Sequence, residues 1–264
     1  LYVKDGVALC VTGMGKVNSA MTLQAILMDD RFDFSNAYIV STGCAGSAIE
    51  YGVMGDVFVI TATVDFDLGH HADARDLTTD LATTWFHDES YDDASAKLLD
   101  QELCEKVFNL VKDVQIETTE KTRAFMAATF DNADWAIRDP KVLRGTTVTG
   151  DNYWKGMHDH ANALLMTETY GCPDPYALTE MEDHAMAVVL DRLGMLDRYI
   201  IIRDSVNTDV FMNGASPESL WDPNFVDSLA SESSVESADI FATAMKNNFT
   251  VGHVVIDAIL NGEL

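Results

Sequence analysis

Five short segments of the chain carry glycine, carboxylate, amide or aromatic residues next to apolar runs. They are residues 12–16 (T-G-M-G-K), 41–46 (S-T-G-C-A-G), 150–154 (G-D-N-Y-W), 179–183 (T-E-M-E-D) and 203–207 (R-D-S-V-N). In open α/β sheets, ligands bind beyond the carboxyl ends of the strands. We therefore expect the chemistry of this protein at these segments.

The two glycine-rich segments are open to two interpretations. Gly13 and Gly15 would let backbone amides approach a ligand, and the N-terminus of a following helix favours an anion. The same glycines would serve equally well in a tight connection between a strand and a helix. Segment 41–46 follows another apolar run and carries the same ambiguity.

The aromatic and acidic segments leave alternatives too. Tyr153 and Trp154 fit either the core or a stacking wall for a planar ligand. Glu180, Glu182 and Asp183 suit the start of a helix, because the helix dipole stabilises negative charge there. A carboxylate among apolar neighbours nevertheless needs polar or charged partners.

Apolar runs and helical patterns alternate along the chain. Strands are predicted at 7–11, 37–40, 56–64, 146–149 and 199–202, and helices at 17–28, 101–112, 182–193 and 237–260, the last interrupted near Gly252. Strands that alternate with helices indicate an α/β fold with a mostly parallel sheet between helices. No repeat or linker divides the chain, so we predict one domain over residues 1–264.

The composition excludes several function classes. With 17 Lys+Arg against 43 Asp+Glu and a formal charge of −26, the chain has little material for the basic face that nucleic acids or anionic lipids require. Its apolar runs are strand-sized, whereas a membrane span needs roughly 18–20 residues. The four cysteines lack metal or paired spacing, and so do His70 and His71 with their neighbouring aspartates. We expect no metal and no cofactor.

Taken in order, the five segments resemble those of the nucleoside phosphorylase and nucleosidase superfamily. There they read roughly T-G-M/I-G-K, N-T-G-S-A-G, S-G-D-x-F, V-E-M-E and R-x-x-S-D. Within it the chain is most similar to the purine nucleoside permease family, through D-F-D-L (65–68), D-A-R (73–75), D-N-Y-W-K-G (151–156), M-E-D (181–183) and R-D-S-V-N (203–207). The resemblance implies a single-domain, three-layer α/β fold whose mixed, mostly parallel sheet is flanked by helices.

The resemblance also implies a cleft for a purine nucleoside. Asn207 would be the catalytic residue at the leaving base, where nucleosidases carry an aspartate, and Glu182 with Met181 would bind the ribose. The other implied roles are base binding by Tyr153, Trp154, Cys44, Ala45 and Gly46, an anion or water site at Gly13, Met14 and Gly15, and further candidates at Arg75, Glu180 and Asp151. Arg75 would either close the site or form a structural ion pair.

Two departures from the superfamily leave the function classes open. Phosphorylases that bind phosphate through an arginine carry it just before the second glycine segment, where this chain has Ser41, and the superfamily's first strand would lie upstream of Leu1. Three classes remain: cleavage of the N-glycosidic bond by water or phosphate, soluble nucleoside binding in the service of transport, and a non-catalytic storage-type relative. We expect a homo-oligomer, and export if a leader precedes residue 1.

Overall fold

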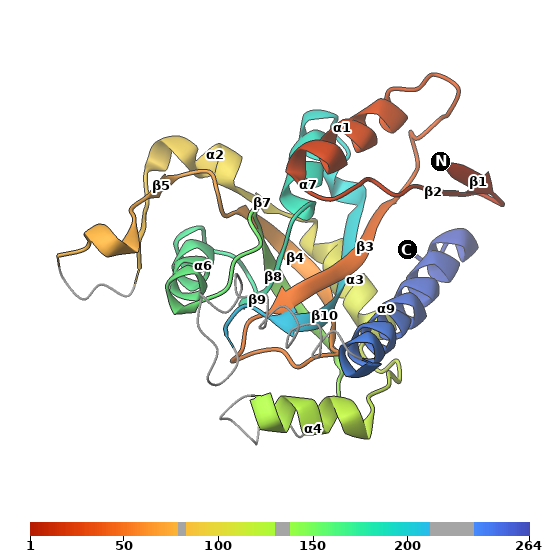
Figure 1. Ribbon diagram of the computed structural model, residues 1–264. Helices are drawn as coiled ribbons and strands as arrows, with labels where there is room; N and C mark the ends of the chain where they lie inside the picture. The colour runs from red at the N-terminus through yellow and green to blue at the C-terminus, as the bar shows by residue number, and fades with distance from the viewer. Residues whose placement is uncertain (79–82, 130–137, 212–234) are drawn as a thin grey trace.

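The central sheet of the molecule closes on itself. Its strands are β3 (Ile39–Ser47), β4 (Val57–Asp65), β7 (Ala96–Leu98), β8 (Val142–Thr149), β9 (Tyr176–Glu180) and β10 (Tyr199–Thr208). In the computed structural model, which describes residues 1–78, 83–129, 138–211 and 235–264, they follow the order β10-β3-β9-β8-β4-β7, and β10 also pairs with β4 (Figure 1). Five strands thus form a barrel-like ring, which β7 extends.

The strand directions correct one expectation. The pairs β10–β3, β4–β8 and β8–β9 are parallel, whereas β10–β4, β3–β9 and β4–β7 are antiparallel. The fold is α/β and the sheet is mixed, as predicted, but three parallel pairs stand beside three antiparallel ones, so the sheet is not clearly mostly parallel. Closure brings β10 against both β3 and β4. Local patterns do not reveal such closure, because it depends on pairing between segments that are distant in the chain.

Helices cover the outside of the ring (Figure 1). They are α1 (Lys16–Leu27), α2 (Asp92–Ser95), α3 (Gln101–Val111), α4 (Glu120–Thr129), α6 (Met157–Thr169), α7 (Asp183–Arg192) and α9 (Val235–Asn261), with 3-10 turns at η1 (Ala74–Asp76), η2 (Glu89–Tyr91) and η3 (Leu196–Arg198). α1 packs on α7, and α3 and α9 pack together. α9 runs through Gly252 without the predicted interruption. Among the described residues, no helix combines the length and apolar character needed to cross a membrane.

The core lies between these helices and the ring. Every residue of β4 from Val57 to Val64 is buried, and most of them are β-branched, as suits a strand covered on both faces. One apolar cluster joins the ring to α1 and α7 through Leu23 and Leu190, and another joins it to α3 and α9 through Val107 and Val255. The strands that carry the polar segments are therefore held rigidly from both sides.

The first predicted strand lies outside the central sheet. β2 (Val7–Leu9) pairs with β1 (Tyr2–Lys4) in a two-stranded hairpin, and β5 (His70–His71) forms a second hairpin with β6 (Trp85–Phe86). Both Leu9 and Val11 are exposed. An apolar run of this length cannot by itself distinguish a buried strand from an exposed one.

Two of the five polar segments lie inside strands rather than beyond their ends. β3 continues through its glycines to Ser47, and β10 continues through Asn207 to Thr208. The two strands run in parallel, with Arg203 opposite Gly43 and Asn207 opposite Gly46. Their register shifts between Ser205 and Asn207, and such bulges commonly re-aim side chains next to sites.

Candidate functional site

A cavity of about 880 Å³ gathers residues from all five predicted segments. Its lining includes the predicted residues Gly13, Met14, Cys44, Ala45, Gly46, Tyr153, Trp154, Glu180, Met181, Glu182 and Asn207. This volume lies within the usual range for small-molecule sites. The structure therefore brings these segments to one cavity, and the roles of the individual residues stay predictions.

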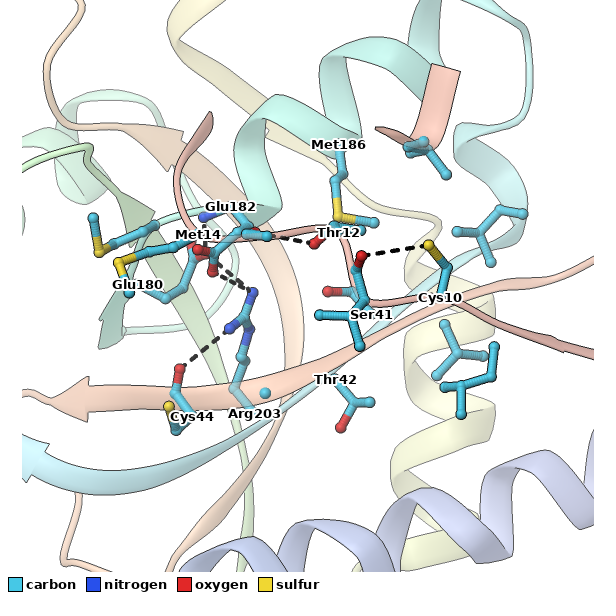
Figure 2. Close-up of a pocket in the computed structure, with 18 of the residues that line it drawn as sticks. Cys10, Thr12, Met14, Ser41, Thr42, Cys44, Glu180, Glu182, Met186 and Arg203 are labelled. Atoms are coloured by element: carbon cyan, nitrogen blue, oxygen red, sulfur yellow. Dashed lines mark hydrogen bonds and ion pairs between the residues drawn. The ribbon is translucent and has the colours of Figure 1, made fainter. Parts of the chain in front are cut away.

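Arg203 stands at the centre of the polar half of the cavity (Figure 2). Its Nε and Nη2 donate to the two carboxylate oxygens of Asp183 at 2.8 and 2.7 Å. Nη2 also reaches Glu180 Oε2 at 3.3 Å and Glu182 Oε2 at 3.2 Å, and Nη1 donates to the carbonyl of Cys44 at 3.2 Å. One guanidinium is thus shared by three carboxylates.

Burial shifts the ionisation of this cluster. Burial opposes the charge of Arg203, but the attraction of Asp183 and Glu180 outweighs it and holds the pKa of the guanidinium well above its ordinary value. Burial, together with the charge of Asp183, raises the pKa of the Glu180 carboxyl to about 7. The backbone amides of Glu182 and Asp183 donate to Glu180 Oε2 at 2.6 and 2.8 Å. Glu180 therefore fixes the backbone that carries Glu182.

Glu182 is held from a second side by the glycine segment. The amide of Gly15 donates to Glu182 Oε1 at 2.9 Å, and the amide of Lys16 donates to Asp151 Oδ1 at 2.8 Å. These amides open α1, where an anion is favoured. Carboxylates of the chain itself therefore occupy part of the predicted anion site, and Gly15 and Asp151 act beside the cavity rather than in its lining.

Arg75 is not brought into the cavity. Its side chain is 88% exposed, and its Nε donates to Asp73 Oδ1 at 3.0 Å. Of the two interpretations that the sequence left open, the structure shows the ion pair.

The D-F-D-L segment (65–68) connects three elements beside the cavity. Lys16 Nζ lies 2.8 Å from both Asp65 Oδ1 and Asp67 Oδ2, and Asp67 in turn accepts from the amide of Asp151 at 2.7 Å. These bonds tie the start of α1, the end of β4 and segment 150–154 together. Burial opposes the charge of Lys16, but the hydrogen bonds that its ammonium donates to Asp65 and Asp67 outweigh this effect and raise the pKa of Lys16.

His70 and His71 do not form a metal site in the part of the chain that the structure describes. Both side chains are exposed in β5. Across residues 1–78, 83–129, 138–211 and 235–264, no group of three or more His, Cys, Asp or Glu side chains is arranged to hold a metal ion.

Asn207 shares the cavity with Arg203, and glycines on β3 make room for both. A Cβ at Gly46 would lie 2.6 Å from Asn207 Oδ1, and a Cβ at Gly43 would lie 2.7 Å from Arg203 Nη1. Real Cβ atoms essentially never come that close to a neighbour. The glycines of segment 41–46 therefore accommodate the side chains of the neighbouring strand.

Arg203 was not among the residues for which the sequence predicted a role. The sequence does contain a signal for such a role, because Arg203 directly follows the apolar run that ends at Ile202. An arginine at the end of a buried strand is expected to be buried too, and a buried guanidinium needs carboxylate partners. Segment 179–183 supplies those carboxylates. The pairing of Arg203 with these carboxylates could not be predicted from the sequence, because it depends on β10 and the start of α7 lying side by side.

The two aromatic residues of segment 150–154 have different environments. Trp154 is 8% exposed and stacks on Phe66, with 5.0 Å between the ring centroids. Tyr153 is 62% exposed, and both residues contribute to the lining of the cavity. Trp154 therefore belongs chiefly to the core, whereas Tyr153 is the better placed of the two to meet a ligand.

If Tyr153 stacks on a purine base, as the sequence predicts, replacing it by alanine should weaken binding of the nucleoside and leave stability nearly unchanged. Stacking on a base is worth about 1–3 kcal/mol, so the dissociation constant for a purine nucleoside should rise about 5- to 150-fold. Trp154→Phe is the matched comparison, because it should lower the melting temperature by opening a gap in the core. Calorimetric titration and thermal unfolding of both variants separate the two effects. Unchanged binding in Tyr153→Ala would contradict the stacking role.

Known proteins match this chain along most of its length. The sequence profile described as purine nucleoside permease (NUP) matches residues 1–263. A probable purine nucleoside permease of Schizosaccharomyces pombe is 27% identical over 224 residues, which cover 75% of this chain and 63% of that protein. A purine nucleoside permease of Candida albicans is 24% identical over 212 residues, which cover 73% of this chain and 52% of that protein. The chain thus spans between half and two thirds of these relatives.

Solved structures with the same fold include nucleosidases. The 5′-methylthioadenosine/S-adenosylhomocysteine nucleosidase of Neisseria meningitidis, in complex with methylthio-immucillin-A, has a TM-score of 0.51 at 18% identity, over 93% of this chain and 78% of that one. That of Helicobacter pylori also has a TM-score of 0.51, at 15% identity over the same shares. At such identities the likeness shows the fold, a single α/β domain like theirs. Because the family profile extends over residues 1–263, this chain belongs to the purine nucleoside permease family.

Proposed function

We propose that the cavity binds a purine nucleoside and cleaves its N-glycosidic bond. The observation that carries this proposal is the convergence of Glu182 and Asn207 in one cavity, next to the exposed ring of Tyr153. A nucleoside offers a diol, a purine nitrogen and a planar face. A fixed carboxylate, an amide and an aromatic ring are suitable partners for these three features.

The charge of the cluster fits bond cleavage. As the bond between sugar and base breaks, positive charge develops on the ribose and negative charge on the base. Glu182 and Asp183 alone outnumber the single Arg203, and Glu180 adds negative charge when it is ionised, so these carboxylates favour positive charge nearby. The amide of Asn207 would donate a hydrogen bond to N7 as the base becomes anionic.

Binding without turnover is the second candidate, as a nucleoside-binding protein in the service of transport. Asn207 favours it, because an amide has no titratable proton to give to the leaving base. The relatives from S. pombe and C. albicans are described as nucleoside permeases, which agrees with a role in transport. Incubation with inosine, guanosine and adenosine decides between the two candidates. Release of free base supports cleavage, and saturable binding with no release supports the second candidate.

Glu182→Gln tests the ribose site. The substitution keeps the shape of the side chain and removes the charge-assisted part of its hydrogen bonds, which contributes about 1.5–3 kcal/mol. Nucleoside affinity should therefore fall about 10- to 150-fold, whereas affinity for the free purine base should change little. Calorimetric titration with inosine and hypoxanthine measures both.

Glu117→Gln provides the matched control, because Glu117 is 64% exposed, pairs with Lys246 and lies outside the cavity lining. It should leave both affinities unchanged. Equal weakening of nucleoside and base by Glu182→Gln, or no weakening of either, would show that Glu182 does not bind the sugar.

A further inference from the structure

The charged groups of the cavity are unbalanced. Among the described residues that line it, the charged side chains are those of Asp33, Glu180, Glu182 and Arg203. Asp183 adds a further carboxylate against the guanidinium. The stretches 79–82, 130–137 and 212–234, which the structure does not describe, contain no Lys, Arg or His in their sequence. The described cavity thus sets one cationic side chain against a surplus of carboxylates.

The single cationic side chain is already engaged. Three carboxylates face Nε and Nη2 of Arg203, and Nη1 donates to the carbonyl of Cys44. An incoming anion would have to compete with groups that are held in place by backbone amides. The geometry therefore offers an anion no free positive partner at Arg203.

The start of α1, the other natural place for an anion, is also engaged. The amides of Gly15 and Lys16 donate to Glu182 and Asp151. The far half of the cavity is apolar, and its lining includes Val7, Leu9, Leu27, Phe34, Ile39 and Val40. A phosphate group there would lose its hydration and gain no counter-charge, which is strongly unfavourable.

From this arrangement we infer that the cavity selects its ligand by charge: it takes the uncharged nucleoside and rejects phosphate-bearing forms. The rejected ligands are a nucleoside 5′-monophosphate and inorganic phosphate, because each would bring a dianion to a surplus of carboxylates or to an apolar wall. The identity of the accepted ligand rests on the proposed function. The rejection of dianions rests on the charges alone.

If the bound nucleoside is cleaved, the attacking group is then water. The oxygen of water bonds to C1′, and the bond from C1′ to the purine nitrogen breaks with its electron pair going to the base. One proton of the water ends on the base, and the other stays on the new 1-hydroxyl. The products are free ribose and free purine, with no ribose 1-phosphate.

Calorimetric titrations of the full chain with inosine, inosine 5′-monophosphate and inorganic phosphate test the selection. Inosine should bind at least about 100-fold more tightly than its 5′-monophosphate, and phosphate should show no dissociation constant below about 1 mM. Phosphate binding below that value, equal binding of nucleoside and nucleotide, or formation of ribose 1-phosphate would overturn the inference. Failure of inosine to bind would contradict the proposed function. The phosphate titration would still test whether the cavity rejects dianions.

Glu182→Gln, titrated with phosphate alone, tests whether charge is the cause. Removing one carboxylate should strengthen phosphate binding at least about 10-fold, whereas Glu117→Gln should change nothing. Thermal unfolding verifies that the variant is folded. If it is not, Glu180→Gln takes its place and is titrated above about pH 8, where Glu180, whose pKa is raised to about 7, is ionised in the unmodified protein and the substitution removes its charge. If a folded variant binds phosphate no more tightly than the unmodified protein does, the inference is overturned.

Discussion

Replacing Arg203 by methionine should lower the free energy of unfolding by about 3–5 kcal/mol, because it leaves buried carboxylates without their counter-charge. The side chain of Arg203 is 6% exposed, and those of Glu180 and Asp183 are more deeply buried still. Methionine matches the length of the arginine stem, so the loss reflects charge and hydrogen bonds more than packing. Urea unfolding at neutral pH measures it.

Arg75→Met is the control for this experiment. It makes the same chemical change at a side chain that is 88% exposed and paired with Asp73. Exposed ion pairs contribute about 0–1 kcal/mol, so stability should hardly change. A loss of less than about 1 kcal/mol in Arg203→Met as well would mean that the three carboxylates do not depend on the guanidinium.

Asn207→Ala should lower kcat for a 6-oxopurine nucleoside about 100- to 1,000-fold while changing its affinity much less. In the proposed cleavage, the hydrogen bond from the amide to N7 would strengthen as the base departs, so its loss would be felt mainly in the transition state. The unmodified protein should prefer inosine or guanosine to adenosine, because the NH₂ of Asn207 can donate to both N7 and O6, whereas adenine has an amino group at position 6.

Asn207→Asp should invert that preference. A protonated aspartic acid donates to N7, and its other oxygen accepts from the 6-amino group of adenine. The inversion requires that the pKa of the introduced carboxyl be raised, an effect that burial in an apolar cleft can produce. Values of kcat/KM for inosine and adenosine on the three proteins provide the measurement. A preference of the unmodified protein for adenosine, or an undiminished kcat in Asn207→Ala, would remove Asn207 from the leaving-group site.

The sequence predicted the parts of the site that depend on local pattern. Gly13 and Met14 precede a helix, Glu182 lies at the start of another, and Asn207 follows a buried run, so each could be recognised from its own neighbours. The resemblance to the permease family then predicted their convergence. The separate environments of Tyr153 and Trp154 could not be predicted, because they depend on where Phe66 lies.

The features that the sequence did not predict depend on distant contacts or weak local signals. β9 is short and follows Pro173 and Pro175, and α6 is rich in His, Asn and Thr, which are poor helix formers. The ring closure through β10 and β4 is a pairing across more than a hundred residues of chain. The ion pairs of Arg203 could not be predicted for the same reason, since Arg203 contacts its carboxylate partners only once β10, β3 and α7 are packed together.

The two glycines of β3 restrict which chemistry can occupy β10. Gly46 has no room for a Cβ, because Asn207 Oδ1 would lie 2.6 Å away, and the same holds for Gly43 beside Arg203. A side chain at position 46 would push the amide of Asn207 aside, and one at position 43 would do the same to the guanidinium of Arg203. Preservation of the site therefore involves β3 as much as β10, because a change on β3 alone would displace the functional groups of its neighbour.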